Sequence, residues 1–229
     1  MRKWNLIIDV AECTNCQLCA LSAMDEYVGN EWQGVAAPMP RNGHRWIDIK
    51  QKERGQAPMI DIAYVPTMCN HCDNAPCVAK GGGTVTKRED GIVIIDPVKA
   101  KGRKDLVESC PYGHIWWNDE AKLPQIWPFD AHLLDQGWMQ TRGQQACPTS
   151  AMRAVKVEDD EMARIARDEG LALGDRHVLR LGRHAELLDL LHHRRLVQRV
   201  HQQAVHALLD VLGRLLAHRE ARVGDHRVV

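Results

Sequence analysis

The alternation of apolar and polar positions in the first 169 residues predicts short strands separated by long loops. Residues Lys3–Asp9, Ile115–Trp117 and Arg153–Val157 have the character of strands. Residues Thr84–Lys87 and Ile92–Ile95 flank an Asp-Gly pair, which predicts a hairpin. The segments between them are rich in Gly, Pro and Asn, so this part of the chain needs a source of order other than regular structure.

Two short helices are expected in the same part of the chain. One covers Leu18–Tyr27. The other is expected to take Asp159 as its cap, to run through Met162 and Ile165, and to end at Gly170. Strands and helices that do not alternate regularly indicate an α+β fold class.

Residues 170–229 form an atypical C-terminal tail. Of these 60 residues, 40 are Leu, Arg, His or Val, and apolar positions between Leu187 and Leu216 recur at helical steps. A basic amphipathic helix lying on a membrane or a partner is one interpretation, and a helical hairpin packed on the body is another. We favour a third, in which the tail is a frame-shift product of a GC-rich gene, and we build no function on it.

Composition and charge exclude several classes of protein. Hydrophobic residues make up 45% of the chain and charged residues 26%, which is ordinary globular usage. Lys plus Arg and Asp plus Glu both number 30, which gives no basic surface for nucleic acid. No stretch approaches the roughly 18–20 apolar residues of a membrane helix, and the start of the chain lacks an export signal. We therefore expect a cytoplasmic protein.

All eight cysteines fall into recognisable motifs. In two-cluster ferredoxins, three closely spaced cysteines hold three corners of one Fe–S cubane, and a fourth cysteine followed by Pro belongs to the partner cluster. This chain has two triplets and two Cys-Pro pairs, which is enough for two complete sets of four. The triplets are Cys13, Cys16, Cys19 and Cys69, Cys72, Cys77, and the Cys-Pro cysteines are Cys110 and Cys147.

Two pairings of triplets with Cys-Pro cysteines are open. In the nested pairing, which we favour, Cys147 completes the first triplet and Cys110 completes the second; the alternative exchanges them. Nesting predicts a double ferredoxin-like iron–sulfur domain over residues 1–169. Its outer unit covers about 1–60 with 115–169, and its inner unit covers about 61–114. Each set would hold one [4Fe-4S] cluster.

Other uses of the cysteines fit less well. Disulfides need an oxidising compartment, and zinc favours two CxxC knuckles or added His ligands. His71 is expected to be a surface or supporting residue rather than a ligand, and an oxygen ligand from Asp130 is not favoured. The sequence contains no Gly-rich phosphate loop, nucleophile elbow or carboxylate pair, so we expect no catalytic site in this chain.

The chain resembles the iron–sulfur subunits that accompany molybdopterin oxidoreductases of the dimethyl-sulfoxide-reductase type. Within that family, it especially resembles the small subunit of a transhydroxylase. The resemblance covers about residues 4–170, and the stretches between the cysteines make it specific. The matching stretches are Asp25–Glu26, Asn30–Trp32, Gly43–Trp46, Cys69–Gly81, Glu89–Val93, Asp96–Pro97, Lys99–Gly102, Cys110–Gly113 and Ala131–Asp135.

The resemblance implies an electron-transfer subunit for a large catalytic partner, which holds molybdenum or tungsten on a pterin and acts on hydroxylated aromatics. There are two alternatives. The partner is another molybdopterin reductase or hydroxylase, or the chain is a free ferredoxin-type carrier. Transhydroxylases of this type have a third cluster, whose ligands would stand at Ala23, Trp127, Asp130 and Gly143, so we predict two clusters here. The family also continues beyond residue 170 into a small β-sandwich domain, which the tail does not resemble.

Overall fold

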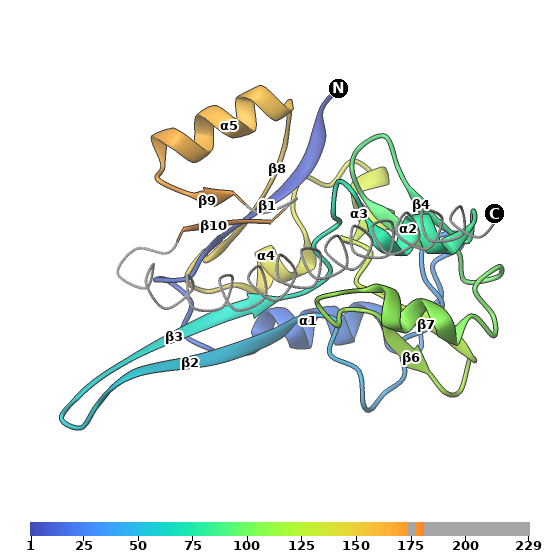
Figure 1. Ribbon diagram of the computed structural model, residues 1–229, viewed down its shortest axis with the longest axis horizontal. Helices are drawn as coiled ribbons and strands as arrows, with labels where there is room; N and C mark the ends of the chain where they lie inside the picture. Colours follow the sequence, from blue (N-terminus) through green and yellow to red (C-terminus); the bar gives the residue numbers. More distant parts are fainter. Residues whose placement is uncertain (174–176, 181–229) are drawn as a thin grey trace, which may run out of the picture. The chain divides into compact units, whose positions relative to one another are not determined.

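The computed structural model describes residues 1–173 and 177–180 (Figure 1). The helical pattern predicted between Leu187 and Leu216 lies outside these residues. The described chain is a mixture of short helices and strands, as the sequence predicts.

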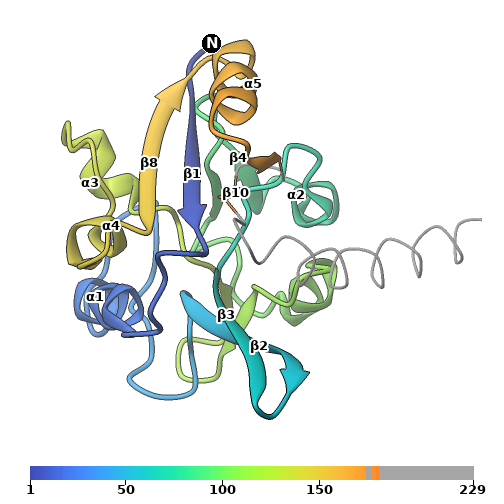
Figure 2. The same cartoon turned by 90° about the vertical axis from the view of Figure 1, so that its left-hand side faces the viewer.

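A four-stranded sheet brings the start and the end of the described chain together. It contains β1 (Lys3–Asp9), β8 (Met152–Val157), β9 (Ala172–Leu173) and β10 (His177–Arg180), in the order β8-β1-β10-β9. Strand β1 pairs with β8 antiparallel and with β10 parallel (Figures 1 and 2). The predicted strand Lys3–Asp9 is confirmed, and the strand predicted at Arg153–Val157 begins one residue earlier.

Strand β1 is central, and its sequence reflects this position. Every residue from Trp4 to Ile8 is buried, the polar Asn5 included, so burial does not alternate along the strand. Ile7 faces α5 (Asp159–Asp168), where it packs with Met162, Ala166 and Leu171. On the opposite face Trp4 approaches Phe129, with ring centroids 6.3 Å apart. Burial on both faces fixes β1 between two layers.

Helix α5 confirms a predicted helix but corrects its cap. The N-cap is Glu158 and makes no side-chain cap hydrogen bond, while Asp159 is the first helical residue. The Asp159 carboxylate instead accepts a hydrogen bond from Lys3 Nζ at 2.6 Å. Three acidic residues in the first turn interact favourably with the positive end of the helix dipole, and this interaction stabilises the helix start in place of a side-chain cap. The chain leaves the helix at Gly170, whose φ is +64°.

Three short helices lie beside the sheet, and the first and last cysteine motifs adjoin two of them. Helix α1 (Leu18–Tyr27) confirms the predicted helix, and it packs against α4 (Arg142–Ala146). Figures 1 and 2 show α1 and α4 side by side, with α3 (Ala131–Asp135) near them. The two helices come close at Gly143, where an added Cβ would lie in ordinary van der Waals contact with Cys19 Cβ, 3.5 Å away.

A long hairpin formed by β2 (Asp48–Gln56) and β3 (Met59–Thr67) projects from the body (Figure 1). The sequence predicts a loop between the first and second cysteine triplets, and this prediction is wrong because the segment forms a paired hairpin. The missed signal is the alternation from Ile60 through Ile62 to Tyr64, which follows a turn that contains Pro58. The apolar residues Met59 and Ile60 at its tip are exposed.

The middle of the chain forms a second cluster of small elements. Strands β4 (Val85–Lys87) and β5 (Val93–Ile95) pair antiparallel, which confirms the predicted hairpin. Strands β6 (Trp116–Asn118) and β7 (Leu123–Gln125) form another, and the strand predicted at Ile115–Trp117 is shifted by one residue. Helix α2 (Pro76–Gly81) and the 3-10 helix η1 (Lys104–Ser109) complete it. A common apolar core joins these elements, and four cysteines pack against it.

Strands β9 and β10 lie beyond the predicted boundary near residue 170 and extend the sheet. The division of the chain at that residue stays a prediction. Within the described residues, no helix has the length and apolar character needed to cross a membrane.

The contact between α5 and β1 can be tested at Met162, which is 4% exposed. We expect Met162→Ala to lower the free energy of unfolding by about 2–5 kcal/mol, because it leaves a cavity between the helix and the sheet. Met139 is 68% exposed, so Met139→Ala should change it by less than about 0.5 kcal/mol and serves as the matched control. Anaerobic denaturant unfolding followed by circular dichroism measures both, and equal effects would contradict the packing described.

Candidate metal centres

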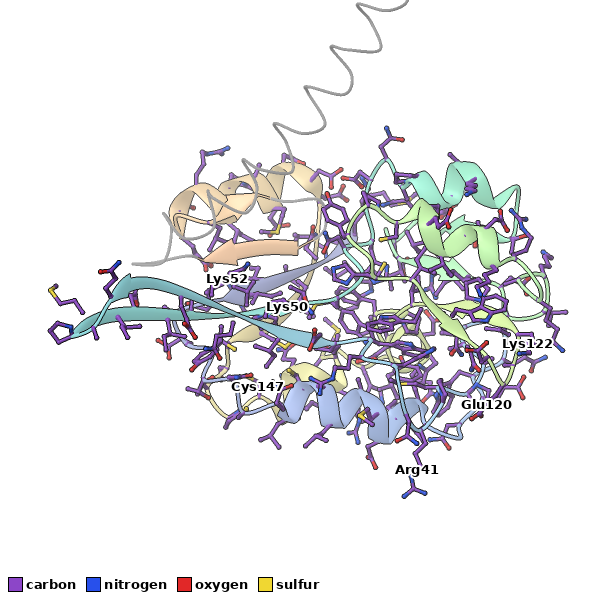
Figure 3. All side chains as sticks on the ribbon, turned by 60° about the horizontal axis from the view of Figure 1, so that its bottom comes forward. Arg41, Lys50, Lys52, Glu120, Lys122 and Cys147 are labelled. Atoms are coloured by element: carbon purple, nitrogen blue, oxygen red, sulfur yellow. The ribbon has the colours of Figure 1, made fainter. Side chains whose placement is uncertain are left out.

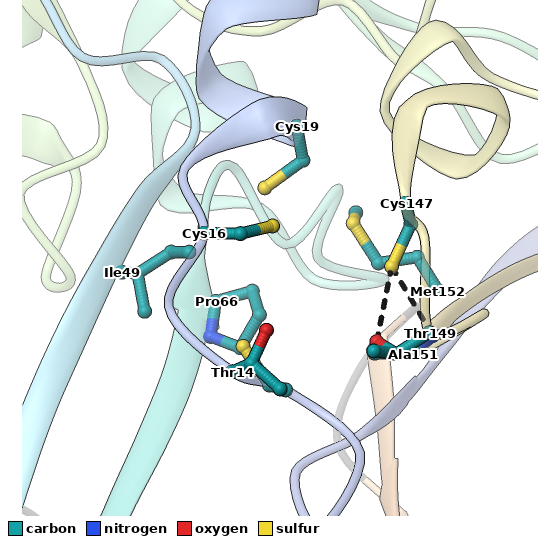
Figure 4. Close-up of a pocket in the computed structure, with 10 residues that line it drawn as sticks. Thr14, Cys16, Cys19, Ile49, Pro66, Cys147, Thr149, Ala151 and Met152 are labelled. Carbon is teal, nitrogen blue, oxygen red and sulfur yellow. Dashed lines mark hydrogen bonds between the residues drawn. The ribbon is translucent and has the colours of Figure 1, made fainter.

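The first cysteine triplet and Cys147 line one pocket. Cys13, Cys16 and Cys19 enter it from the loop before α1 and from its first turn, and Cys147 enters from the end of α4 (Figure 4). Ile49, Pro66 and Met152 complete its apolar wall. Figure 3 shows Cys147 beside the start of α1 and near the base of the β2–β3 hairpin. We call these four cysteines the outer set.

Strained backbone turns shape the loops of both triplets. Asn15 and Gln17 have φ of 59° and 63°, and His71 has φ of 45°. Residues other than glycine rarely adopt this left-handed conformation. A backbone hydrogen bond at Asn15 favours the thiolate of Cys13, and one at His71 favours that of Cys69, although burial has the larger effect on both pKa values. Asn15 and His71 occupy the same place in their motifs, two residues after the first cysteine.

The two Cys-Pro segments form matching turns. The backbone N–H of Ala151 donates to Cys147 Sγ at 3.2 Å, and that of His114 donates to Cys110 Sγ at 3.4 Å. In each case the donor lies four residues after the cysteine and follows a residue with positive φ, Gly113 or Ser150. Such N–H donors stabilise a thiolate, and hydrogen bonds to sulfur are one factor that sets cluster potentials.

The inner set consists of Cys69, Cys72, Cys77 and Cys110. All four are partly buried against the apolar core of the middle segment. Cys69 lies close enough to the other three for their charges to raise its pKa, although burial is the larger cause. The structure therefore places Cys147 near the first triplet and Cys110 near the second; the pairing of these cysteines on iron stays a prediction.

Four of the thiols, those of Cys13, Cys19, Cys69 and Cys77, resist ionisation because their pKa values are raised. Burial raises the pKa of Cys19 to about 11, and it raises the pKa of Cys13 and Cys77 as well. Neighbouring thiols of the same set raise these pKa values further, because two thiolates close together repel each other. Positive charge delivered by iron would relieve both costs.

The donor set of each group, four cysteine thiols, is the one that a [4Fe-4S] cubane takes. Within residues 1–173 and 177–180, no three His, Cys, Asp or Glu side chains converge closely enough to hold one metal ion. A cubane differs because each thiolate binds a separate iron at its own corner. Four thiols and turns that direct N–H groups at sulfur are the donors that such a cluster takes.

Two of the positions that the family resemblance assigns to a third cluster, Trp127 and Asp130, take part in a buried hydrogen-bond network. Asp130 Oδ1 accepts hydrogen bonds from Tyr27 Oη at 2.7 Å and from Trp127 Nε1 at 2.9 Å, and Oδ2 accepts from Arg142 N at 2.8 Å. Burial raises the pKa of Asp130, while the three donors act in the opposite direction. Ala23 and Gly143 are also buried. Three donors therefore occupy the Asp130 carboxylate.

Two contacts of the inner loop were not anticipated from the sequence. His71 is buried rather than at the surface, and its Nδ1 accepts a hydrogen bond from Val93 N at 3.0 Å. Lys87 Nζ donates to the backbone oxygens of His71 and Cys72. Neither contact leaves a signal in the sequence, because the residues are far apart along the chain.

Comparisons with known proteins agree with this geometry. Residues 60–157 match the family described as the 4Fe-4S dicluster domain. Over 174 residues the chain is 47% identical to the pyrogallol hydroxytransferase small subunit of Pelobacter acidigallici. The aligned residues make up 75% of this chain and 63% of that protein. It is 29% identical over 160 residues to a subunit of the tetrathionate reductase of Salmonella typhimurium, with 69% and 58% covered. It is 34% identical over 146 residues to a putative dimethyl sulfoxide reductase iron-sulfur subunit of Halobacterium salinarum, with 60% and 54% covered.

By this likeness, residues 60–157 are similar to a 4Fe-4S dicluster domain. The three relatives confirm the resemblance to iron–sulfur subunits of oxidoreductases of the dimethyl-sulfoxide-reductase type, and among them to the pyrogallol hydroxytransferase small subunit. The chain spans less than two thirds of the length of each of these three relatives.

The Asp130 network can be tested by removing one donor. We expect Tyr27→Phe to lower the free energy of unfolding by about 1.5–3 kcal/mol, the usual value of a hydrogen bond to a charged group. Tyr64→Phe on the half-buried face of β3 is the control and should have a smaller effect. Denaturant unfolding under anaerobic conditions measures both variants; equal losses would contradict a special role for the Tyr27 hydroxyl.

The raised thiol pKa values make iron binding depend on pH. A thiol whose pKa lies above its usual value keeps its proton at neutral pH and releases it when iron binds, so binding strengthens as the pH rises. We expect iron release to a chelator to accelerate as the pH falls from about 8 to about 6, because each freed thiolate takes up a proton. Absorbance of the chelator complex follows the rate, and a rate independent of pH would refute this linkage.

Proposed function

We propose that this chain is an iron–sulfur electron-transfer subunit that carries two [4Fe-4S] clusters. The outer set, Cys13, Cys16, Cys19 and Cys147, holds one cluster, and the inner set, Cys69, Cys72, Cys77 and Cys110, holds the other. The observation that carries the proposal is the gathering of eight thiols into two groups, each with N–H donors directed at sulfur. The clusters supply one-electron redox chemistry, and the chain binds them, shields them and sets their potentials.

The two groups belong to two nested ferredoxin-like units. The pairing of β1 with β8 supports an outer unit, since each strand adjoins a motif of the outer set. The β4–β5 hairpin and the apolar core that joins it to α2 and η1 support an inner unit, although that core also takes in Leu123 of β7 from beyond the expected boundary. The number of clusters is two, because Ala23, Trp127 and Gly143 offer no ligand and the carboxylate of Asp130 is held by three donors.

The partner is a large catalytic subunit that carries molybdenum or tungsten on a pterin, and the complex acts on hydroxylated aromatics. The likeness to the pyrogallol hydroxytransferase small subunit supports both points. Two of the relatives are reductase subunits, and this observation favours a second candidate function, the iron–sulfur subunit of a molybdopterin reductase. The complex works in the cytoplasm, where a reducing environment keeps thiols available for iron.

Iron and sulfide analysis of the anaerobically purified complex tests the cluster count. We expect about eight irons and eight acid-labile sulfides per chain, and two signals in the low-temperature EPR spectrum of the reduced protein. About twelve irons per chain would overturn the count, since three cubanes need that number. A colourless protein with zinc and no sulfide would overturn the whole proposal.

Single Cys→Ala variants test the pairing. Cys147→Ala should remove the same EPR signal as Cys13→Ala, because the two thiols line one pocket. Cys77→Ala is the matched control and should remove the other signal. If Cys147→Ala removes the signal that Cys77→Ala removes, the exchanged pairing is correct instead.

A further inference from the structure

Lys87, at the end of β4, is bound to the inner cysteine loop through its whole ammonium group. Its Nζ lies 2.9 Å from the backbone oxygen of His71, 2.7 Å from that of Cys72 and 3.2 Å from Asp73 Oδ1. A lysine ammonium has three N–H donors, and these three acceptors match them. The side chain is only 21% exposed, so the charge is held in place rather than free in solvent.

The residue paired with Lys87 across the hairpin holds the same loop. Val93 on β5 is the register partner of Lys87, and its backbone N–H donates to His71 Nδ1 at 3.0 Å. The His71 ring lies edge-on to Phe129, with centroids 5.3 Å apart. His71 has the left-handed φ of 45°, an unfavourable conformation for this residue unless its surroundings hold it. One cross-strand pair thus fixes the turn between Cys69 and Cys72 from two sides.

The charge of Lys87 acts on Cys77 of the inner set. Burial raises the pKa of Cys77 overall, and Lys87 acts in the opposite direction by favouring the thiolate. Reduction of a bound cluster adds one negative charge at the same place. A fixed cation stabilises the reduced state more than the oxidised state, and partial burial makes its field stronger than it is in water.

We propose that Lys87 is a positioning residue of the inner centre, which holds the Cys69–Cys72 loop in its ligand-binding conformation and raises the reduction potential of the cluster bound there. The inference rests on the function proposed above. The reduction potential of the inner cluster is thus set in part by one side chain, which the β4–β5 hairpin contributes.

An EPR-monitored redox titration of the purified complex tests the inference. Cys77→Ala and Cys13→Ala assign the inner and outer signals. Lys87→Met should lower the midpoint potential of the inner signal and leave the outer one unchanged, and Lys87→Arg should restore it at least in part. Lys99→Met is the matched control, because Lys99 is exposed and its ion pair is with Asp96 and not with a residue of the loop; it should move neither signal.

Asp73 provides a second test with the opposite sign. Its carboxylate opposes the charge of Lys87, so Asp73→Asn should raise the midpoint potential of the inner signal. This variant decides the question if Lys87→Met loses the inner cluster. Two titrating signals that neither Lys87→Met nor Asp73→Asn moves would overturn the role of Lys87 and leave the proposed function intact. Absence of both signals in the unaltered complex would instead overturn the proposed function.

Discussion

The constraint on which this structure depends is that each group of four thiols draws on distant stretches of chain. Cys13, Cys16 and Cys19 come from the segment that follows β1, and Cys147 comes from the end of α4. Bringing such segments together costs loop-closure entropy, which grows slowly with the length of the loop. The antiparallel pairing of β1 with β8 and the contact of α1 with α4 offset that cost close to the thiols.

Burial and backbone geometry give the thiols their chemistry. Enclosure by protein makes a bare thiolate unfavourable, as the raised pKa of Cys19 reflects. The turns around Asn15, His71 and Ser150 direct N–H groups toward the sulfurs and so favour the anionic form. The two effects oppose each other. A positively charged iron core would remove the cost of the buried thiolates while the N–H groups continued to favour them.

Aromatic residues and the hydrogen-bonded Asp130 connect the two groups of thiols. Trp127 stacks on Phe129 with centroids 5.0 Å apart, and both approach His71 of the inner loop. Asp130 ties this aromatic group to Tyr27 on α1 and to the start of α4, next to Gly143. A hydrogen-bonded aromatic core therefore stands where the transhydroxylase pattern would place further cysteines, and it connects the inner loop with the helices of the outer set.

Local patterns in the chain were enough to predict the cysteine motifs, the strand Lys3–Asp9, the helix Leu18–Tyr27 and the Asp-Gly hairpin, because spacing and apolar runs are properties of neighbouring residues. The hairpin β2–β3 also has a local signal, an alternation that was missed. Tertiary packing was needed to show that Cys147 lies with the first triplet, that Lys87 holds the inner loop, and that Asp159 pairs with Lys3 instead of capping its helix. The physical reason is that each of these contacts joins residues that are remote in the chain, so their partners depend on how the layers pack and not on any neighbouring residue.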